Sequence, residues 1–277
     1  MNNDELLRRA RTDQERRGQL PNTIRQRTLR LRAFARHLGE RSLLEATRED
    51  IEAFLDERDI KPGTRYGWVS HIHCFYEWAI DQELTTTDPT TRIRRPKLRR
   101  SLPRPADTSQ LQDALHYGDP MLRCWITLAA YQGLRVQEIA GLDRMDIDLA
   151  EGRLRVVHGK GAKERVLPLH PDVAEALICL PMPKTGRIFQ RPRGGGYSPA
   201  ELSRVFNQRL AEYGVEAVAH QLRHWFGTNL YAATGDLRVT QEMLGHSSPT
   251  TTAGYVSFSA KKATEGVHAL NLGGEAA

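Results

Sequence analysis

Residues 152–169 read GRLRVVHGKGAKERVLPL, and this stretch decides the class of the fold. Residues 152–158 and 164–169 are rich in amino acids that favour strands, and the glycine-rich run GKGAK at 159–163 joins them. Two such segments with a short glycine-containing connection predict a β-hairpin. Most of the remaining chain repeats apolar residues at helical intervals. We therefore expect a mainly α-helical fold with a small β-hairpin or sheet.

Helices are predicted on both sides of this hairpin. Before it, an apolar helix over residues 122–132 leads to Gly133, and a new helix begins near Arg135. The helices after the hairpin are predicted from Pro171 onward and at residues 199–213, 217–232, 237–244 and 259–270. This second part of the chain is therefore a mixed α/β domain.

The first ninety residues have the pattern of a compact helical bundle. Apolar residues recur at helical spacing over residues 24–38, and Gly39 ends this segment. Residues 47–50 (TRED) resemble a capping box that opens an amphipathic helix. Lys61-Pro62-Gly63 predicts a turn, and residues 68–80 predict a further helix. About four short helices make the simplest assembly.

A proline-rich, basic linker joins the two parts. Residues 85–107 contain four prolines, which argue against continuous helix. We expect a helical domain at residues 1–95, a linker at 96–106 and a second domain at 107–277. The residues expected to grip phosphates are Arg94, Arg95, Lys97, Arg99 and Arg100. A solvated charged tether without this grip fits the same composition.

The composition favours a polyanionic partner. The chain has 40 Lys and Arg against 34 Asp and Glu, a net charge of +6, and basic clusters gain affinity by releasing counterions from phosphates. Three widely spaced cysteines indicate neither a disulfide framework nor a thiolate metal site, which fits the cytoplasm. The sequence has no secretory signal and no apolar run long enough to cross a bilayer, so no membrane partner is expected.

Four short signals follow one another along the second part. They are GLRVQE (133–138), GKG (159–161), HQLRH (220–224) and LGH (244–246), and Tyr255 lies nine residues after His246. In this order and spacing they resemble the tyrosine recombinase (phage integrase) family, whose pattern is Arg, Lys, His-x-x-Arg, His or Trp, and Tyr. The resemblance is close over residues 130–258. It implies a helical core-binding domain followed by a mixed α/β tyrosine-recombinase catalytic domain.

The catalytic set that the resemblance implies is Arg135, Lys160, His220, Arg223, His246 and Tyr255. Two guanidiniums can clamp phosphoryl oxygens with forked hydrogen bonds that lysine cannot copy. The phenol of the implied nucleophile, Tyr255, has an ordinary pKa near 10, so neighbouring positive charge must make it reactive. The resemblance assigns Lys160 to protonate the leaving 5′ oxygen, and Lys163 is close enough in sequence to be a rival.

Two further residues are expected to support this site. Glu138 stands three residues after Arg135, where it can orient that arginine. His220 and His224 have an i,i+4 spacing that also allows a zinc site, with His246 as a third ligand. Arg223 between the histidines would repel a cation, and the sequence contains no HExxH motif. We therefore expect no metal and no other cofactor, and we assign His224 a supporting role.

The resemblance also implies a reaction and its partners. Tyr255 would attack a phosphate of double-stranded DNA and form a 3′-phosphotyrosyl link, and a second 5′-hydroxyl would reverse the attack. Four protomers would assemble on two DNA sites, with an accessory directionality factor as a further partner. Phage or mobile-element integration is the expected role. A type IB-like topoisomerase and a DNA-binding regulator with an inactive site are the alternatives.

The predicted helix at residues 259–270 bears on this assembly. Its apolar residues form one narrow stripe at three- and four-residue steps, so that stripe must be buried. It can fold back on its own catalytic domain or dock on a neighbouring subunit. The second arrangement would couple the position of Tyr255 to assembly of a closed ring.

Overall fold

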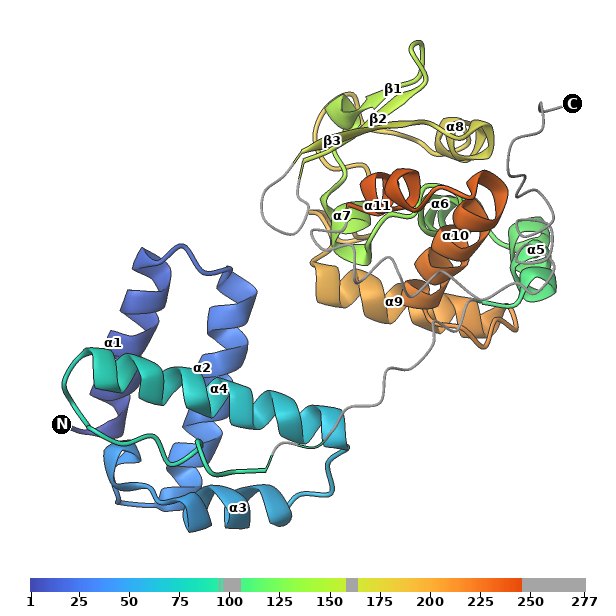
Figure 1. The fold of residues 1–277 in the computed structure, drawn as a ribbon. Helices are drawn as coiled ribbons and strands as arrows, with labels where there is room; N and C mark the ends of the chain where they lie inside the picture. Colours follow the sequence, from blue (N-terminus) through green and yellow to red (C-terminus); the bar gives the residue numbers. More distant parts are fainter. Residues whose placement is uncertain (95, 97–105, 158–163, 246–277) are drawn as a thin grey trace, which may run out of the picture. The chain divides into compact units, whose positions relative to one another are not determined.

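The computed structural model describes residues 1–94, 96, 106–157 and 164–245. The chain divides into two compact units, residues 1–100 and 101–277, and each is described by itself (Figure 1). The first unit is helical, and the second combines helices with a three-stranded sheet, so the expected fold class is confirmed. In the described part of the chain, no helix is both long and apolar enough to span a membrane.

The first unit is a bundle of α1 (Asn3–Arg16), α2 (Pro21–Leu38), α3 (Arg48–Asp56) and α4 (Pro62–Asp81), with a 3-10 turn η1 (Leu43–Glu45). Its core contains an aromatic cluster in which the Phe54 ring centroid lies 5.1 Å from that of Phe34 and 5.2 Å from that of Trp68. Phe34 and Phe54 are fully buried. Aromatic pairs at such distances add to the stabilisation that burial itself provides.

The helix boundaries of this unit follow local chemistry. The expected capping box is confirmed at α3, where the Thr47 side chain accepts a hydrogen bond from the backbone of Asp50 and the Asp50 side chain accepts one from Thr47. Gly39 ends α2 with a φ of 69°. The turn predicted at Lys61-Pro62-Gly63 is wrong, because Pro62 is the first residue of α4. Proline suits a first helical position, where its missing N–H needs no partner and its φ is already helical.

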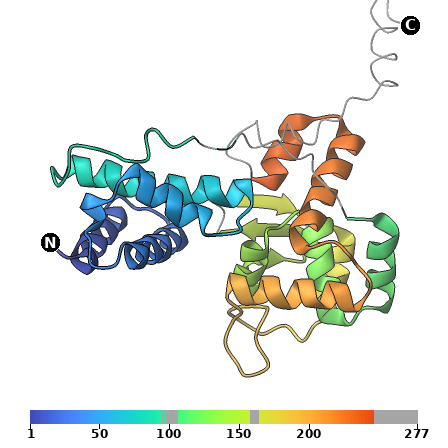
Figure 2. The same cartoon turned by 90° about the horizontal axis from the view of Figure 1, so that it is seen from below.

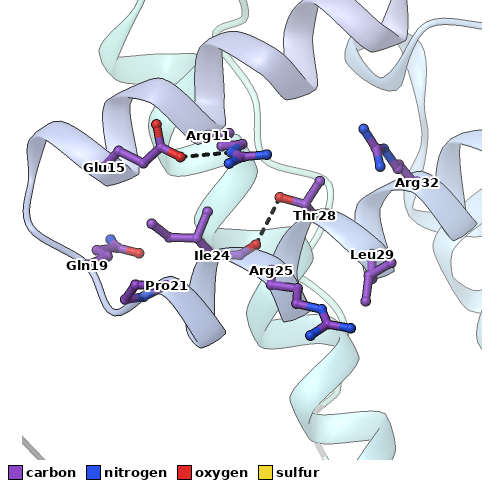
Figure 3. Close-up of a pocket in the computed structure, with 9 residues that line it drawn as sticks. All are labelled: Arg11, Glu15, Gln19, Pro21, Ile24, Arg25, Thr28, Leu29 and Arg32. Carbon is purple, nitrogen blue, oxygen red and sulfur yellow. Dashed lines mark hydrogen bonds and ion pairs between the residues drawn. The ribbon is translucent and has the colours of Figure 1, made fainter. Parts of the chain in front are cut away.

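A pocket of about 540 Å³ lies between α1 and α2 (Figure 3). Pro21, Ile24 and Leu29 supply apolar lining, and Arg25 and Arg32 are also among the residues that line it. This pocket belongs to the first unit and contains none of the residues that the sequence predicts to be catalytic.

The second unit begins with α5 (Thr108–Tyr117), α6 (Pro120–Ala130) and α7 (Val136–Gly141). A 3-10 turn η2 (Arg144–Asp146) leads into β1 (Ile147–Asp148), β2 (Arg153–Val156) and β3 (Arg165–Pro168). The remaining helices are α8 (Pro171–Ile178), α9 (Pro199–Glu212), α10 (Ala219–Thr234) and α11 (Leu237–Leu244).

The three strands form an antiparallel sheet in the order β1-β2-β3. Leu154 of β2 pairs with Leu167 of β3, and both side chains are buried. This pairing is the predicted hairpin. The two-residue strand β1 was not predicted, because so short a segment carries no alternating pattern.

Helix α6 lies at the centre of the second unit (Figure 1), and Figure 2 shows the same fold from below. Its residues from Cys124 to Ala130 are all buried, and it contacts α5, α7, α8, α9 and α10. The Trp125 ring centroid lies 5.6 Å from that of Phe206 and 6.1 Å from that of Phe189. A helical segment that is buried on all sides belongs in the middle of a domain. Helix α6 therefore provides a rigid base for the loop that comes after it.

Candidate active site

The loop after α6 positions Arg135. Gly133 has a φ of 66°, and a Cβ atom there would come within 2.4 Å of the Phe226 ring on α10. Only glycine fits this left-handed conformation at such close approach. Two residues later Arg135 is the N-cap of α7, and its side chain is 21% exposed. The backbone therefore brings α6, α7 and α10 together at the residue that the sequence singled out.

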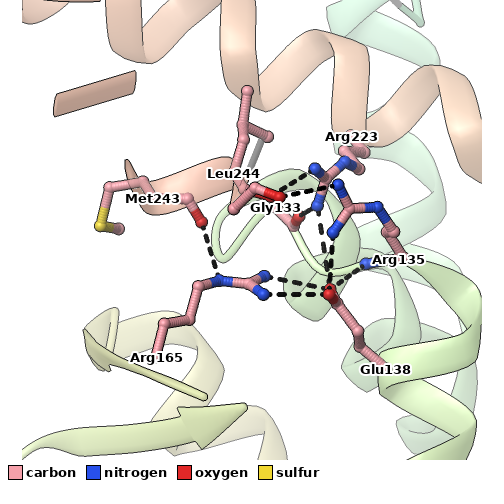
Figure 4. Close-up of polar contacts among 8 residues, drawn as sticks. Gly133, Arg135, Glu138, Arg165, Arg223, Met243 and Leu244 are labelled. Atoms are coloured by element: carbon pink, nitrogen blue, oxygen red, sulfur yellow. Dashed lines mark hydrogen bonds and ion pairs between the residues drawn. The ribbon is translucent and has the colours of Figure 1, made fainter. Parts of the chain in front are cut away.

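Arg223 lies on α10, and its side chain is 2% exposed. Its Nη1 donates to the carbonyl of Gly133 and its Nη2 to the carbonyl of Leu244 (Figure 4). Nη1 also lies 3.8 Å from Oε2 of Glu138. Removing a guanidinium from water costs on the order of several kcal/mol unless hydrogen bonds and an opposite charge compensate it. The site therefore holds this charge with fixed polar groups.

Glu138 is the centre of the cluster, with a side chain that is 1% exposed. Its Oε2 accepts from the backbone N of Arg135 at 2.8 Å and its Oε1 from Nη1 of Arg135 at 2.9 Å. Burial raises the pKa of this carboxyl, but hydrogen bonds and charges from Arg165, Arg135 and Arg223 outweigh burial and hold the pKa below its ordinary value. Glu138 is therefore ionised at neutral pH, and its two oxygens bind the backbone and the side chain of Arg135.

Arg165 on β3 completes the cluster, and sequence reasoning missed it. Its Nη1 and Nη2 form a forked pair with Oε1 and Oε2 of Glu138 at 3.0 and 3.1 Å (Figure 4). Strand alternation carried a usable signal, because Arg165 is two residues from buried Leu167 and so lies on the core-facing side of β3. However, Arg165 closely follows the lysine-containing segment 159–163 in sequence, so it resembles an ordinary solvated arginine.

The C-terminal end of α11 meets all three arginines. The carbonyl of Met243 accepts from Nε of Arg165 at 3.3 Å, and that of Leu244 accepts from Arg223. The carbonyl of Gly245 accepts from Nη2 of Arg135 at 3.1 Å. The last carbonyls of a helix lack helical partners and carry partial negative charge, so cations stabilise them. Three consecutive carbonyls thus fix the end of α11 against the cluster.

His220 and His224 lie one turn apart on α10, with ring centroids 4.5 Å apart in an edge-to-face arrangement. Partial desolvation and the charges of Arg223 and Arg135 lower the pKa of His220 below its ordinary value. Burial, followed by the neighbouring His220 and Arg223, lowers the pKa of His224 to about 4. Both imidazoles are neutral at pH 7, so each has one nitrogen that can accept a proton.

The structure brings together Arg135, Glu138, Arg223, His220 and His224 of the predicted set. Lys160, its rival Lys163, His246 and Tyr255 lie outside the described residues, as does the predicted helix at 259–270. Of the predicted phosphate-gripping residues, Arg94 is exposed, whereas Arg95, Lys97, Arg99 and Arg100 lie outside the described residues. Among the residues that are described, no three His, Cys, Asp or Glu side chains form a group that could hold a metal ion.

Comparison with known proteins identifies relatives that cover most of the chain. The model of the phage integrase family matches residues 104–262. A tyrosine recombinase XerC of Myxococcus xanthus is 31% identical over 273 residues, which cover 89% of this chain and 90% of the relative. A tyrosine recombinase XerC of Bradyrhizobium diazoefficiens is 32% identical over 258 residues, covering 83% of this chain and 80% of the relative.

Solved structures share the fold. The integrase of transposon Tn1549, in complex with transposon right end DNA, superposes with a TM-score of 0.74 at 18% identity, covering 97% of this chain and 100% of that chain. A lambda integrase dimer bound to a COC′ core site gives a TM-score of 0.73 at 23% identity, with 92% and 95% coverage. The family match covers more than half of this chain, and the XerC relatives cover most of it. The chain therefore belongs to the phage integrase family and is a tyrosine recombinase, an enzyme that breaks and rejoins DNA.

Proposed function

We propose that this chain is a site-specific recombinase that cleaves double-stranded DNA with Tyr255 and rejoins it through a 3′-phosphotyrosyl intermediate. The observation that carries the proposal is the charge of the cluster. Three guanidiniums, those of Arg135, Arg165 and Arg223, surround the one carboxylate of Glu138. These four groups have a net charge of +2, from three positive charges and one negative. An anionic group beside them, such as a phosphodiester, would balance that charge.

The proposed cleavage follows from these groups. Arg135 and Arg223 clamp the non-bridging phosphate oxygens and stabilise the charge that develops on them. Neutral His220 accepts the proton of Tyr255 as the phenol oxygen attacks phosphorus. The bond to the 5′ oxygen breaks, and Lys160 protonates that oxygen to give a 5′-hydroxyl. His246 donates a hydrogen bond to a non-bridging oxygen, while His224 supports His220.

Rejoining reverses these steps. A 5′-hydroxyl of the partner strand attacks the phosphotyrosyl phosphorus, its proton passes to Lys160, and Tyr255 leaves with a proton from His220. The phosphodiester count is unchanged, so the exchange needs no nucleotide cofactor. We propose four protomers on two DNA sites, and a structure of a lambda integrase tetramer bound to a Holliday junction supports this assembly. We also propose that residues 1–95 form the core-binding domain. The linker residues that would bind DNA phosphates are Arg94, Arg95, Lys97, Arg99 and Arg100.

The biological role is either resolution of chromosome dimers or integration of a phage or mobile element. Two relatives that cover most of this chain at more than 30% identity are XerC recombinases, which favours resolution of chromosome dimers over the integration expected from sequence. The phage and transposon integrases above are similar in fold. We therefore propose a XerC-like role, in which the enzyme acts on the chromosome in the cytoplasm. An accessory directionality factor would be a partner of this chain if its role is integration instead.

Covalent trapping tests both parts of this proposal. The full chain is incubated with nicked fragments of the source genome, because loss of a short strand beyond the nick prevents rejoining and accumulates the adduct. Denaturant-resistant complexes are isolated and the attached DNA is sequenced. One chromosomal site would support the XerC-like role, whereas the ends of a phage or transposon would support integration. No adduct from any fragment would contradict the proposed function itself. Tyr255→Phe is the matched control.

A further inference from the structure

Arg165 joins three elements of the second unit that are far apart in sequence. It lies on β3, forms a forked pair with Glu138 of α7, and donates from Nε to Met243 near the end of α11. Its side chain is 13% exposed. All three guanidinium nitrogens therefore have partners, an arrangement that fixes both the position and the plane of the group.

The contacts of Arg165 limit how Glu138 can bind Arg135 and Arg223, the two arginines predicted to clamp the phosphate. Each Glu138 oxygen already accepts one hydrogen bond from Arg135 and one from Arg165. Nη1 of Arg223 stays 3.8 Å from Oε2, beyond hydrogen-bond distance. Since Arg165 occupies the second acceptor site of each oxygen, it limits how closely Arg223 can approach the carboxylate.

The end of α11 is shaped around the same guanidinium. Gly245 has a φ of 60°, and a Cβ atom there would lie 2.9 Å from Nη1 and 3.1 Å from Cζ of Arg165. A glycine at this helix end therefore allows both the left-handed cap and the close packing of Arg165. Arg165 therefore packs against Gly245, whose carbonyl binds Arg135, and it pairs with Glu138, whose carboxylate also binds Arg135.

We propose that Arg165 is a positioning residue for strand cleavage, which acts through Glu138 and the end of α11 to hold Arg135 and Arg223 as a phosphate clamp. This inference rests on the proposed function. Without Arg165, the freed acceptor sites of Glu138 attract the guanidinium of Arg223, and the end of α11 loses one of its three anchors. The clamp then moves away from the phosphate, although both of its arginines are still present.

The experiment measures single-turnover adduct formation on the duplex recovered by covalent trapping. The variants are Arg165→Gln and Arg165→Lys, because lysine keeps the charge but cannot form the forked pair. Displacing reacting groups by about 1 Å can cost on the order of 100-fold in rate. We expect both variants to cleave at least about tenfold more slowly than wild type, with DNA affinity within about twofold.

The matched control is Arg155→Gln on the neighbouring strand. Arg155 pairs with the buried carboxylate of Asp146 at 3.2 Å instead of with Glu138, so it tests the loss of a strand arginine as such. We expect its cleavage rate to equal that of wild type. If Arg165→Gln does not fold, as judged by its thermal transition, Arg165→Lys carries the test. Wild-type cleavage by Arg165→Lys would overturn the inference.

Two further measurements separate positioning from other roles. Adding Glu138→Gln to Arg165→Gln should slow cleavage little beyond the slower single variant, since both changes act through the same pair. A duplex with sulfur at the bridging 5′ position should leave the Arg165 defect unchanged, because the clamp is needed whichever atom leaves. Full rescue by sulfur would mean that Arg165 acts through the acid on the hairpin, and would overturn the inference. If wild type itself forms no adduct, the proposed function fails instead.

Discussion

Replacing Glu138 by glutamine takes a buried negative charge away from Arg135, Arg165 and Arg223. The carboxylate accepts four hydrogen bonds, two from Arg135 and two from Arg165, and it lies 3.8 Å from Nη1 of Arg223. Glutamine keeps one accepting oxygen and turns an NH₂ group toward guanidinium donors. Breaking a buried ion pair by removing one partner costs about 3–5 kcal/mol. We expect Glu138→Gln to lower the free energy of unfolding by about this amount.

The assay is thermal and urea unfolding of the full chain at pH 7 and at low pH. For a unit of this size, about 3–5 kcal/mol corresponds to a melting temperature lower by about 6–20 °C. The matched control is Glu201→Gln, which removes a capping carboxylate at the exposed start of α9. We expect a much smaller loss of stability there, because this carboxylate is exposed to solvent.

The pH dependence of stability gives an independent check. The folded-state pKa of Glu138 lies below its ordinary value because the arginines outweigh burial. Such a carboxylate stabilises the fold above the unfolded pKa of about 4.3, and this contribution is lost as pH falls through the folded pKa. Wild type should therefore lose stability in acid, and Glu138→Gln should lack that part of the loss. A variant within about 1 kcal/mol of wild type at both pH values would refute the reasoning.

Four further predictions concern the site and the assembly. Gly133→Ala should destabilise the second unit by about 1–3 kcal/mol in urea unfolding, because the new Cβ meets the Phe226 ring; an unchanged midpoint would contradict the close approach. Lys160→Ala should cleave normal DNA slowly and recover on a 5′-bridging sulfur substrate; recovery by Lys163→Ala instead would mean that Lys163 is the acid. A strong chelator should leave adduct formation intact, and loss that zinc or magnesium restores would argue for a metal site. Deleting residues 260–277 should preserve half-site binding while weakening synapsis and cleavage, whereas an unaffected truncation would assign that helix no role between subunits.

Local patterns predicted most of the fold. The hairpin follows from strand-forming segments around a glycine-rich tip, and the α3 capping box follows from Thr47 and Asp50. Both depend on residues that are neighbours in sequence. The prediction failed at Lys61-Pro62-Gly63, because a Pro-Gly pair suits the first turn of a helix as well as a loop. Proline alone does not say on which side of it the helix lies.

The candidate site was predictable only in part. The motif order located Arg135, Glu138 and Arg223, and the structure brings these residues together. It did not reveal Arg165, whose partners at Glu138 and Met243 are 27 and 78 residues away. Nor did it reveal that the carbonyls at the end of α11 bind the arginines. Contacts over such separations depend on how elements pack, which helical spacing and turn chemistry do not specify.

The identity of the nucleophile is the central claim, and mass spectrometry of the trapped adduct tests it most directly. After nuclease and protease digestion, we predict that the modified peptide contains Tyr255 and that fragmentation places a 3′-linked nucleotide on its phenol oxygen. Tyr255→Phe should give no modified peptide while binding the same duplex. A nucleotide on any other residue, or an adduct that persists in Tyr255→Phe, would contradict the account.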